Sequence, residues 1–266
     1  MAEMIVTGKV ALIAGAAKGM GLAISQSFLE RGAQVCLADI NLQALQSAAK
    51  DLRDTYGYQN VTYYECDVTE KYQFQAAFHH TKFYFKGLFD IVVNAAAVIN
   101  ADNWERNVQV NLGGVINGTE IAFDFMNEQG GGVIVNIGSI AGVRPWDYHM
   151  VPVYAAAKAA VVAYTQSFAK SRGALEKGIR MTCVCPAPTG AEIMADESEM
   201  LAKLDVVDAI LTKERAKPEE VAKVTMRLVE DDESNGIVAV MDAPKKVDYR
   251  HYDRMLFSSA SDGTGA

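Results

Sequence analysis

The chain has 266 residues, of which 50% are hydrophobic and 22% charged, and its formal net charge is -8. This length and composition are typical of one large α/β domain or two small ones. The acidic balance, without a basic block, argues against nucleic acid or an anionic membrane surface as a partner. No apolar run approaches the roughly 18 residues that a membrane span needs, and residues 1–8 do not resemble a signal peptide.

The four cysteines are Cys36, Cys66, Cys183 and Cys185. Three of them lie in apolar, strand-like runs, which predicts reduced core thiols in a cytoplasmic protein. The Cys183-x-Cys185 spacing is typical of neither a metal site nor a redox motif. We therefore expect no metal centre.

The first elements follow a strand–turn–helix order. Residues 9–14 form a short apolar run that predicts a buried strand. A turn with Gly15, Gly19 and Gly21 follows, then an amphipathic helix, a second strand over 33–39 and a second helix over 41–56. This rhythm is typical of a mononucleotide-binding βαβ unit.

The alternation of strands and helices continues along the chain. It predicts strands over 61–65, 89–93, 133–137, 180–185 and 237–241, and helices over 70–85, 104–128, 152–175 and 218–230. The expected fold is one doubly wound Rossmann-type α/β domain over residues 1–257, a seven-stranded parallel sheet with helices on both faces. We expect residues 192–215 to form a mobile lid over a substrate and residues 258–266 a flexible tail.

The glycine turn and the two acidic residues that follow strands predict a nucleotide site. Glycines let the backbone turn tightly and approach a pyrophosphate at a helix N-terminus. Asp39 ends the second strand, where a carboxylate accepts ribose hydroxyls and repels a 2′-phosphate, which favours NAD over NADP. Lys18 in the same turn favours NADP instead, because its positive charge could meet that 2′-phosphate. Asp67 either bonds the adenine edge or caps the next helix.

Tyr154 and Lys158 form the candidate proton-handling pair. Residues four apart in a helix share one face, so the phenol and the ammonium reach a common point. A neighbouring ammonium favours phenolate and lowers a tyrosine pKa from about 10, which makes the phenol a proton shuttle.

Together these motifs resemble the short-chain dehydrogenase/reductase superfamily over nearly the whole chain. The resemblance is carried by Gly15-x-x-x-Gly19-x-Gly21, Asp67-Val68, Asn94, Asn111, Ser139 and Tyr154-x-x-x-Lys158. Within it the chain is most similar to the NAD-dependent 15-hydroxyprostaglandin dehydrogenases, on residues 103–106, 109–112, 117–119, 152–154 and 252–257. Insect alcohol dehydrogenases are more distant relatives.

The resemblance implies a role for each matched residue. Tyr154 is expected to be the acid or base, and Ser139 is expected to bond the substrate oxygen. Lys158 is expected to lower the Tyr154 pKa and to bond the nicotinamide ribose. Asn111 is expected to hold a water in a proton path. Val151, Ser139 and Tyr154 are expected to contact the substrate. The expected NAD-binding residues are Gly15, Lys18, Gly19, Met20, Gly21, Asp39, Ile40, Asp67, Val68, Asn94, Ala95, Ala96, Tyr154, Lys158, Pro186 and Thr189.

The chain departs from the family pattern at several positions near the expected cofactor. Asn94-Ala-Ala-Ala97 stands where the family usually has Asn-Asn-Ala-Gly, and Pro186-Ala187 replaces Pro-Gly. Val151 occupies the place of a substrate-bonding glutamine of the prostaglandin dehydrogenases. The catalytic set is intact, so these changes concern cofactor affinity and substrate choice.

The predicted function is NAD-dependent interconversion of a secondary alcohol and a ketone on a mostly apolar small molecule: a lipid, eicosanoid-like, steroid, retinoid or terpenoid alcohol. Two alternatives are an NADP-linked carbonyl reductase and a nucleotide-binding protein with feeble catalysis. Trp146, Tyr148 and Phe257 either line an apolar substrate pocket or cover the core edge. Because the family dimerises through two long helices, here bearing Phe123, Phe125, Tyr164 and Phe168, the resemblance implies a homodimer or homotetramer.

Overall fold

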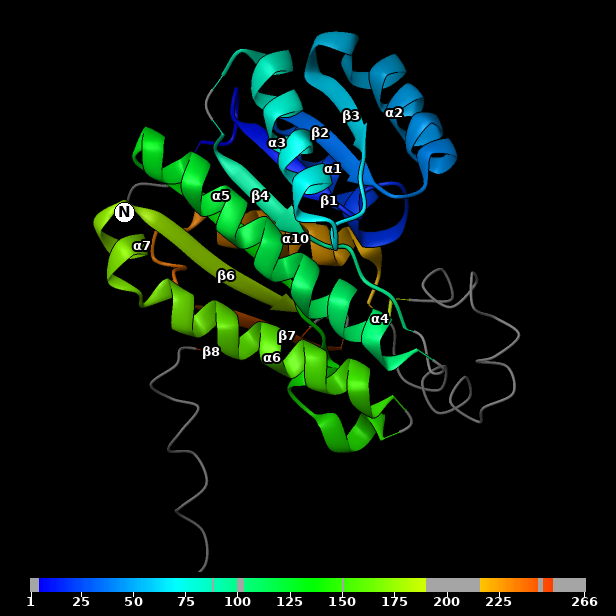
Figure 1. Ribbon diagram of the computed structural model, residues 1–266, viewed down its shortest axis with the longest axis vertical. Coiled ribbons are helices and arrows are strands. Elements are labelled where there is room, and N and C mark those ends of the chain that lie inside the picture. The colour runs from blue at the N-terminus through cyan, green and yellow to red at the C-terminus, as the bar shows by residue number, and fades with distance from the viewer. Residues whose placement is uncertain are drawn as a thin grey trace, which may run out of the picture.

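Within the part of the chain that the structure describes, eight strands form one sheet (Figure 1). The computed structural model describes residues 5–87, 89–99, 103–149, 151–189, 216–243 and 246–250. The strand order is β3-β2-β1-β4-β5-β6-β7-β8. The strands are β1 Val10–Ala14, β2 Gln34–Asp39, β3 Val61–Glu65, β4 Ile91–Asn94, β5 Gly132–Ile137, β6 Ile179–Cys185, β7 Val238–Ala243 and β8 Lys246–Arg250.

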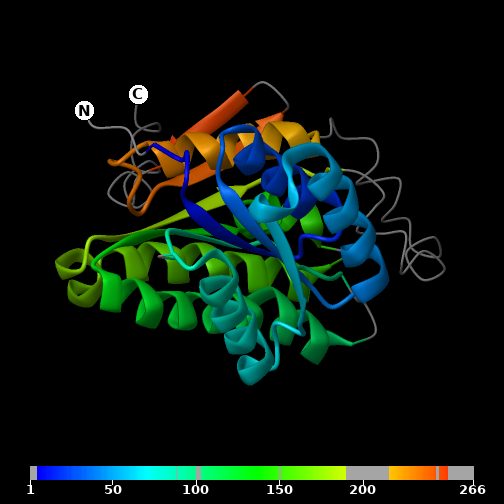
Figure 2. The same cartoon turned by 90° about the horizontal axis from the view of Figure 1, so that it is seen from above.

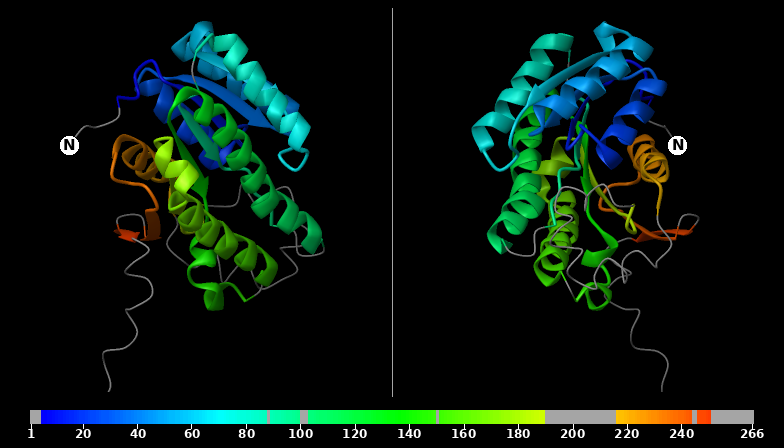
Figure 3. Two further views of the ribbon diagram at one scale, coloured as in Figure 1. Left: turned by 60° about the vertical axis from the view of Figure 1, so that its left-hand side comes forward. Right: turned by 90° about the vertical axis from the view of Figure 1, so that its right-hand side faces the viewer.

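Helices cover both faces of the sheet, as Figures 2 and 3 show. One face carries α1 Gly19–Glu30, α2 Leu42–Tyr56 and α10 Pro218–Glu230, and the other carries α3 Lys71–Phe85, α5 Val115–Gln129 and α6 Pro152–Ala169. The central strands β1 and β4 are buried along their whole length because they are covered on both sides. The doubly wound α/β fold predicted from the sequence is therefore confirmed.

The sheet has one strand more than the seven parallel strands predicted. Strands β1 to β7 are parallel, but an eighth strand, β8, pairs with β7 antiparallel as a hairpin. Its residues are exposed or half-buried, and Tyr249 lies under the guanidinium of Arg227, 4.7 Å from ring centroid to Cζ. An edge strand of mixed polarity carries no buried apolar run, so the pattern used for the other strands misses it.

Of the two predicted long helices, one contains a π-helical turn and the other ends earlier than predicted. The first consists of α4 Trp104–Val108, a π-helical turn over Gln109–Gly114 and α5. The second ends at Ala169, and Ser171 caps a separate short helix, α7 Arg172–Glu176, by accepting the Ala174 N–H. Three 3-10 helices complete the described elements: η1 Tyr58–Asn60, η3 Ile140–Gly142 and η4 Pro145–Tyr148.

Local capping chemistry accounts for where two of the helices begin. Helix α10 starts with Pro218 in its first turn, and the Glu220 carboxylate accepts the Lys217 N–H at 2.9 Å. Helix α2 starts after Asn41, whose side chain accepts the Ala44 N–H at 3.0 Å. These caps satisfy N–H groups that a helix leaves without partners.

In the described ranges, no helix is long and apolar enough to cross a membrane. All four cysteines are buried and free, as predicted. The proposed lid over 192–215, the tail over 258–266 and Phe257 lie outside the described residues.

Candidate active site

A cleft opens where the sheet reverses its strand order, between the C-terminal ends of β1 and β4. This is the position at which doubly wound sheets bind ligands. The cleft has a volume of about 280 Å³. Its walls come from the glycine turn, the ends of β2 to β4 and α4: Gly15, Ala17, Lys18, Gly19, Met20, Gly21, Asp39, Ile40, Asn41, Ala44, Cys66, Asp67, Val68, Ala95, Ala96, Ala97, Val98, Arg106 and Val110.

The glycine turn can hold no larger residue at two positions. Gly15 has φ +77°, and a Cβ there would lie 2.6 Å from the Ala96 nitrogen. A Cβ on Gly21 would overlap the carbonyl oxygen of Gly15. The turn is thus packed directly against the segment that follows β4, and its glycines leave backbone exposed to the cleft.

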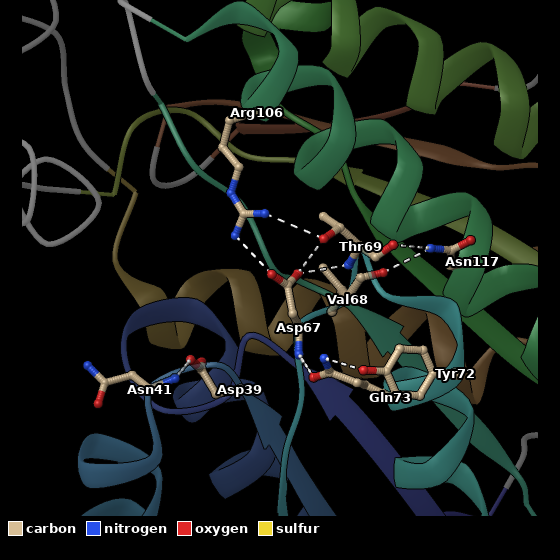
Figure 4. A network of polar contacts seen from close by, with 9 residues as sticks. All are labelled: Asp39, Asn41, Asp67, Val68, Thr69, Tyr72, Gln73, Arg106 and Asn117. Carbon is tan, nitrogen blue, oxygen red and sulfur yellow. Dashed lines mark hydrogen bonds and ion pairs between the residues drawn. The ribbon is translucent and has the colours of Figure 1, made fainter.

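Asp39 presents a fixed carboxylate to the cleft (Figure 4). One carboxylate oxygen accepts the Ala17 N–H and the other accepts the Asn41 N–H, each at 3.0 Å. These bonds fix the side chain between the glycine turn and α2. Its remaining lone pairs suit the paired hydroxyls of a ribose.

The Asp67 carboxylate bonds to Thr69 and Arg106 and does not cap the following helix. Its Oδ1 accepts the backbone N–H of Thr69 at 2.9 Å and the Thr69 hydroxyl at 2.7 Å, and its Oδ2 pairs with Arg106 at 3.2 Å (Figure 4). Burial opposes ionisation of Asp67, but the Thr69 bonds and the Arg106 charge outweigh it and lower its pKa. The residue before α3 is Glu70, so the alternative in which Asp67 caps that helix is wrong.

Arg106 is a cleft residue that the sequence analysis did not single out. It reaches the cleft from α4, and its guanidinium donates to the Thr69 hydroxyl at 3.4 Å as well as to Asp67. The only sequence signal was its place in the segment 103–106. Sequence patterns do not show which strand end a helix crosses, so this contact needed the structure.

Asn94 and Asn111 lie beside the cleft but are not among the residues that line it. The Asn94 amide donates to Asn136 Oδ1 at 2.8 Å. Asn111, in the π-helical turn, donates to the Val98 carbonyl at 2.7 Å and accepts the Val98 N–H at 3.2 Å. The Asn94 side chain therefore links the end of β4 to β5, and the Asn111 side chain fixes the backbone of Val98 in the cleft segment 95–98.

A second cluster gathers at the ends of β5 and α6. Ser139 follows β5, and its side chain hydrogen-bonds to the Tyr154 hydroxyl. Since the serine oxygen accepts the Ala141 N–H at 3.1 Å, its own O–H is available to donate to the phenol. Lys158 Nζ donates to the Ile137 carbonyl at 2.9 Å and lies 5.8 Å from the centroid of the Tyr154 ring. The predicted triad is thus assembled.

The protein's own groups shift both pKa values away from a phenolate–ammonium pair. Burial raises the pKa of Tyr154 to about 12, although the Ser139 hydrogen bond acts in the opposite direction. Burial also lowers the pKa of Lys158 to about 8. The sequence analysis expected Lys158 to lower the Tyr154 pKa, but desolvation of the phenol is the largest effect on that pKa, followed by the opposing effect of Ser139.

The remaining predicted contacts lie around this cluster. Val151 and Tyr148 are buried and pack with Tyr154 in one apolar group, whereas Trp146 is 70% exposed and lines no core. The Pro186 carbonyl accepts the Ile140 N–H at 2.9 Å, just after Ser139. Thr189 is half-buried and is the last described residue before the break at 190–215.

Comparison with known proteins agrees with this geometry. The family model for short chain dehydrogenase matches residues 9–202, which include both the cleft and the Tyr154 cluster. The chain belongs to the short chain dehydrogenase family. Among the described residues, no group of three or more His, Cys, Asp or Glu side chains is placed to hold a metal ion.

Individual relatives of this short chain dehydrogenase match over almost their full length. The chain is 35% identical to 15-hydroxyprostaglandin dehydrogenase [NAD(+)] of Rattus norvegicus, covering 97% of this chain and 99% of the relative. It is 34% identical to the Homo sapiens protein of the same name, covering 96% and 99%. The 3-oxoacyl-[acyl-carrier-protein] reductase FabG of Thermotoga maritima is 31% identical, covering 87% and 94%.

Proposed function

We propose that this chain is an NAD-dependent alcohol dehydrogenase that interconverts a secondary alcohol and a ketone on a mostly apolar small molecule. One observation carries the proposal: a buried Ser139–Tyr154–Lys158 cluster follows the strand next to a nucleotide-sized cleft. The cluster handles a proton, and the cleft suits a cofactor that handles a hydride. Membership in the short chain dehydrogenase family agrees with this assignment of proton transfer to the cluster and hydride transfer to the cofactor.

The cleft fits the adenosine end of NAD. Its glycine turn leaves no room for a Cβ at Gly15, so a ligand meets bare backbone N–H groups near the start of α1. The fixed Asp39 carboxylate suits ribose hydroxyls and repels a 2′-phosphate, so NAD is the cofactor. The prostaglandin dehydrogenase relatives carry NAD(+) in their names.

The residues beyond the adenosine end divide the chemistry among them. NAD, when bound, supplies the acceptor for the hydride that leaves the carbinol carbon. Tyr154 takes the alcohol proton, and the Ser139 O–H holds the substrate oxygen within reach of the phenol. Lys158 would hold a ribose hydroxyl of bound NAD and favour the phenolate. The protein's own groups leave the Tyr154 pKa at about 12, so a bound, positively charged cofactor would be needed to lower it further.

The apolar lining supports an apolar substrate. Val151, Tyr148 and Ile140 pack around Tyr154. Val151 offers no hydrogen bond where the resemblance places a glutamine in prostaglandin dehydrogenases, so we propose a lipid, steroid, retinoid or terpenoid alcohol as readily as an eicosanoid. Pro186 and Thr189 stand at the nicotinamide end of the proposed site.

Oligomer formation through α5 and α6 is part of the proposal. Phe123 on α5 and Phe168 on α6 are half-buried and meet edge to face at 5.6 Å, and Tyr164 lies beside Phe168. An apolar groove on the same side runs along α6 from Pro152 to Ala160. Phe125 takes no part, because it belongs to the core. Sedimentation of the purified protein tests whether it is a dimer or a tetramer.

A turnover screen tests the enzyme proposal. NAD and NADP are each supplied with secondary alcohols of graded chain length and ring size, and the reduced cofactor is followed at 340 nm. We expect turnover with NAD that increases with apolar bulk. A preference for NADP favours a carbonyl reductase. Tight NADH binding with no turnover across alcohols and ketones favours a nucleotide-binding protein with feeble catalysis.

A further inference from the structure

Two cysteines lie directly beneath the proposed proton-transfer residues. Cys183 and Cys185 are two apart on β6, so their side chains leave the same face of the sheet. Their sulfur atoms are 3.7 Å apart, and both residues are fully buried in the group that contains Tyr154. Nothing in the proposed reaction uses them.

The neighbouring glycine lets both sulfurs approach the backbone that leads to Ser139. A Cβ on Gly138 would lie 2.8 Å from the sulfur of Cys185 and 2.9 Å from that of Cys183. The backbone N–H of Gly138 donates at 2.7 Å to the carbonyl of Val184, which lies between the two cysteines on β6. The two sulfurs therefore lie against the residue that directly follows Ile137, whose carbonyl accepts a hydrogen bond from Lys158 Nζ.

Lys158 is the buried cation next to this pair. Its side chain is 1% exposed. Within the described ranges it makes no ion pair with a carboxylate, and the charges that act on it are those of the two thiols. A buried ammonium without a counter-ion is costly and tends to lose its proton. The site therefore needs a negative group, and the thiol pair is placed to provide it.

We propose that Cys183 and Cys185 together act as the counter-ion of the Lys158 ammonium and keep that amine protonated while Tyr154 exchanges the alcohol proton. In the charged pair, Cys183 has released its proton to solvent. Cys185 keeps its proton and donates its S–H to the Cys183 sulfur. The two cysteines are positioning residues, because they act on the reaction through Lys158.

The electrostatic surroundings agree with this assignment of the shared proton. The hydrogen bond from Cys185 lowers the pKa of Cys183, and Lys158 lowers it further, whereas the same hydrogen bond raises that of Cys185. Around Lys158 the facing groups are Tyr154 on α6, the Ile137 carbonyl on β5 and the two sulfurs on β6. Tyr148 faces Tyr154 from η4, and burial raises its pKa, so it stays neutral.

A thiolate titration tests the coupling without a substrate. Absorbance at 240 nm is followed against pH and corrected for tyrosinate with the signal at 295 nm. Burial raises the pKa of Cys36 and of Cys66 to about 12, so below pH 11 the signal reports the pair. We expect Lys158→Met to raise the midpoint by at least about one pH unit, and Lys50→Met, an exposed lysine on α2, to leave it unchanged. Equal midpoints in wild type and Lys158→Met overturn the proposal.

The reciprocal measurement follows the lysine and keeps the test valid if Lys158→Met does not fold. In protein labelled with ¹³C at the lysine ε position, one signal is expected to titrate near pH 8, well below the exposed lysines. The double variant Cys183→Ala/Cys185→Ala should move it to lower pH, because linkage is reciprocal. Cys36→Ala is the matched control. An unmoved signal in the double variant contradicts the proposal.

This inference rests on the proposed role of Lys158 in proton transfer, but the two can fail separately. Both titrations run in the absence of alcohol and NAD. If the thiol and lysine titrations are coupled but the protein has no turnover, the proposed function is wrong and the coupling stands. An active protein whose lysine signal does not move in the double cysteine variant retains the proposed function and loses the coupling.

Discussion

Lys158 Nζ donates to the carbonyl oxygen of Ile137 at 2.9 Å, and this bond ties the middle of α6 to the end of β5. Because Ser139 lies two residues beyond Ile137, the bond sets the distance between the hydroxyl that holds the substrate and the phenol that takes its proton. It also leaves a charged amine inside the protein. The burial that fixes the position of the amine also lowers its pKa, so the amine loses its proton more easily than an exposed lysine.

The stability of the protein should depend on pH through Lys158. Its pKa is about 8 in the folded protein and 10.5 in the unfolded chain, so between these values the unfolded chain binds more protons and stability rises with pH. Relative to Lys158→Met, the wild type should gain about 3 kcal/mol in free energy of unfolding as pH rises through this window. Urea denaturation of both proteins at pH 7 and pH 10 measures this gain. A stability difference that is the same at both pH values contradicts the buried ammonium.

Replacing the glycine of the nucleotide turn should be far more harmful than replacing a comparable glycine elsewhere. Gly15 and Gly8 both have φ +77°, but a Cβ on Gly15 meets the Ala96 nitrogen at 2.6 Å, and a Cβ on Gly8 has nothing within 4 Å. Gly8→Ala should cost about 1 kcal/mol from backbone strain, and Gly15→Ala at least about 2 kcal/mol more. Denaturation of both variants gives the difference.

The same pair of variants separates folding from cofactor binding. NADH fluorescence titration should show near-normal affinity in Gly8→Ala and little binding in Gly15→Ala, because the displaced backbone closes the cleft. Equal affinity in the two variants would mean that the cofactor lies elsewhere.

Cofactor choice should follow the charge of Asp39. The variant Asp39→Asn keeps an oxygen that accepts the Ala17 or Asn41 N–H but removes the negative charge beside the ribose site. The affinity ratio of NADP to NAD should rise by roughly tenfold or more, which corresponds to about 1.4 kcal/mol. Fluorescence titration with NADH and NADPH measures it. If the wild type already prefers NADPH, the assignment of NAD is wrong.

The sequence predicted the parts of the fold that follow from buried apolar runs and glycine turns. Strand β3 and helix α10 have the bounds that were expected. Such runs are readable because a parallel sheet covered on both faces needs apolar residues at consecutive positions. The edge strand β8 alternates in exposure and depends on its hairpin partner β7, so its own residues do not mark it as a strand.

The sequence likewise predicted some residues of the candidate site and missed others. Tyr154, Lys158 and Ser139 were recognisable because their chemistry and spacing are repeated in a known family. Arg106 and the sulfur pair were not, because each depends on a contact between residues distant in sequence or on a side chain buried beneath the site. Asn111 was expected to serve a water, but its amide makes direct hydrogen bonds to Val98 across a π-helical turn that helical periodicity does not reveal.

The central claim is that Tyr154 moves the alcohol proton. It is tested by comparing Tyr154→Phe with Tyr164→Phe, a half-buried tyrosine ten residues along the same helix. For the secondary alcohol that the wild type oxidises fastest, kcat should fall by about a thousandfold in Tyr154→Phe and stay near wild type in Tyr164→Phe, with NADH affinity unchanged in both. Substantial turnover by Tyr154→Phe with normal NADH binding would contradict the account.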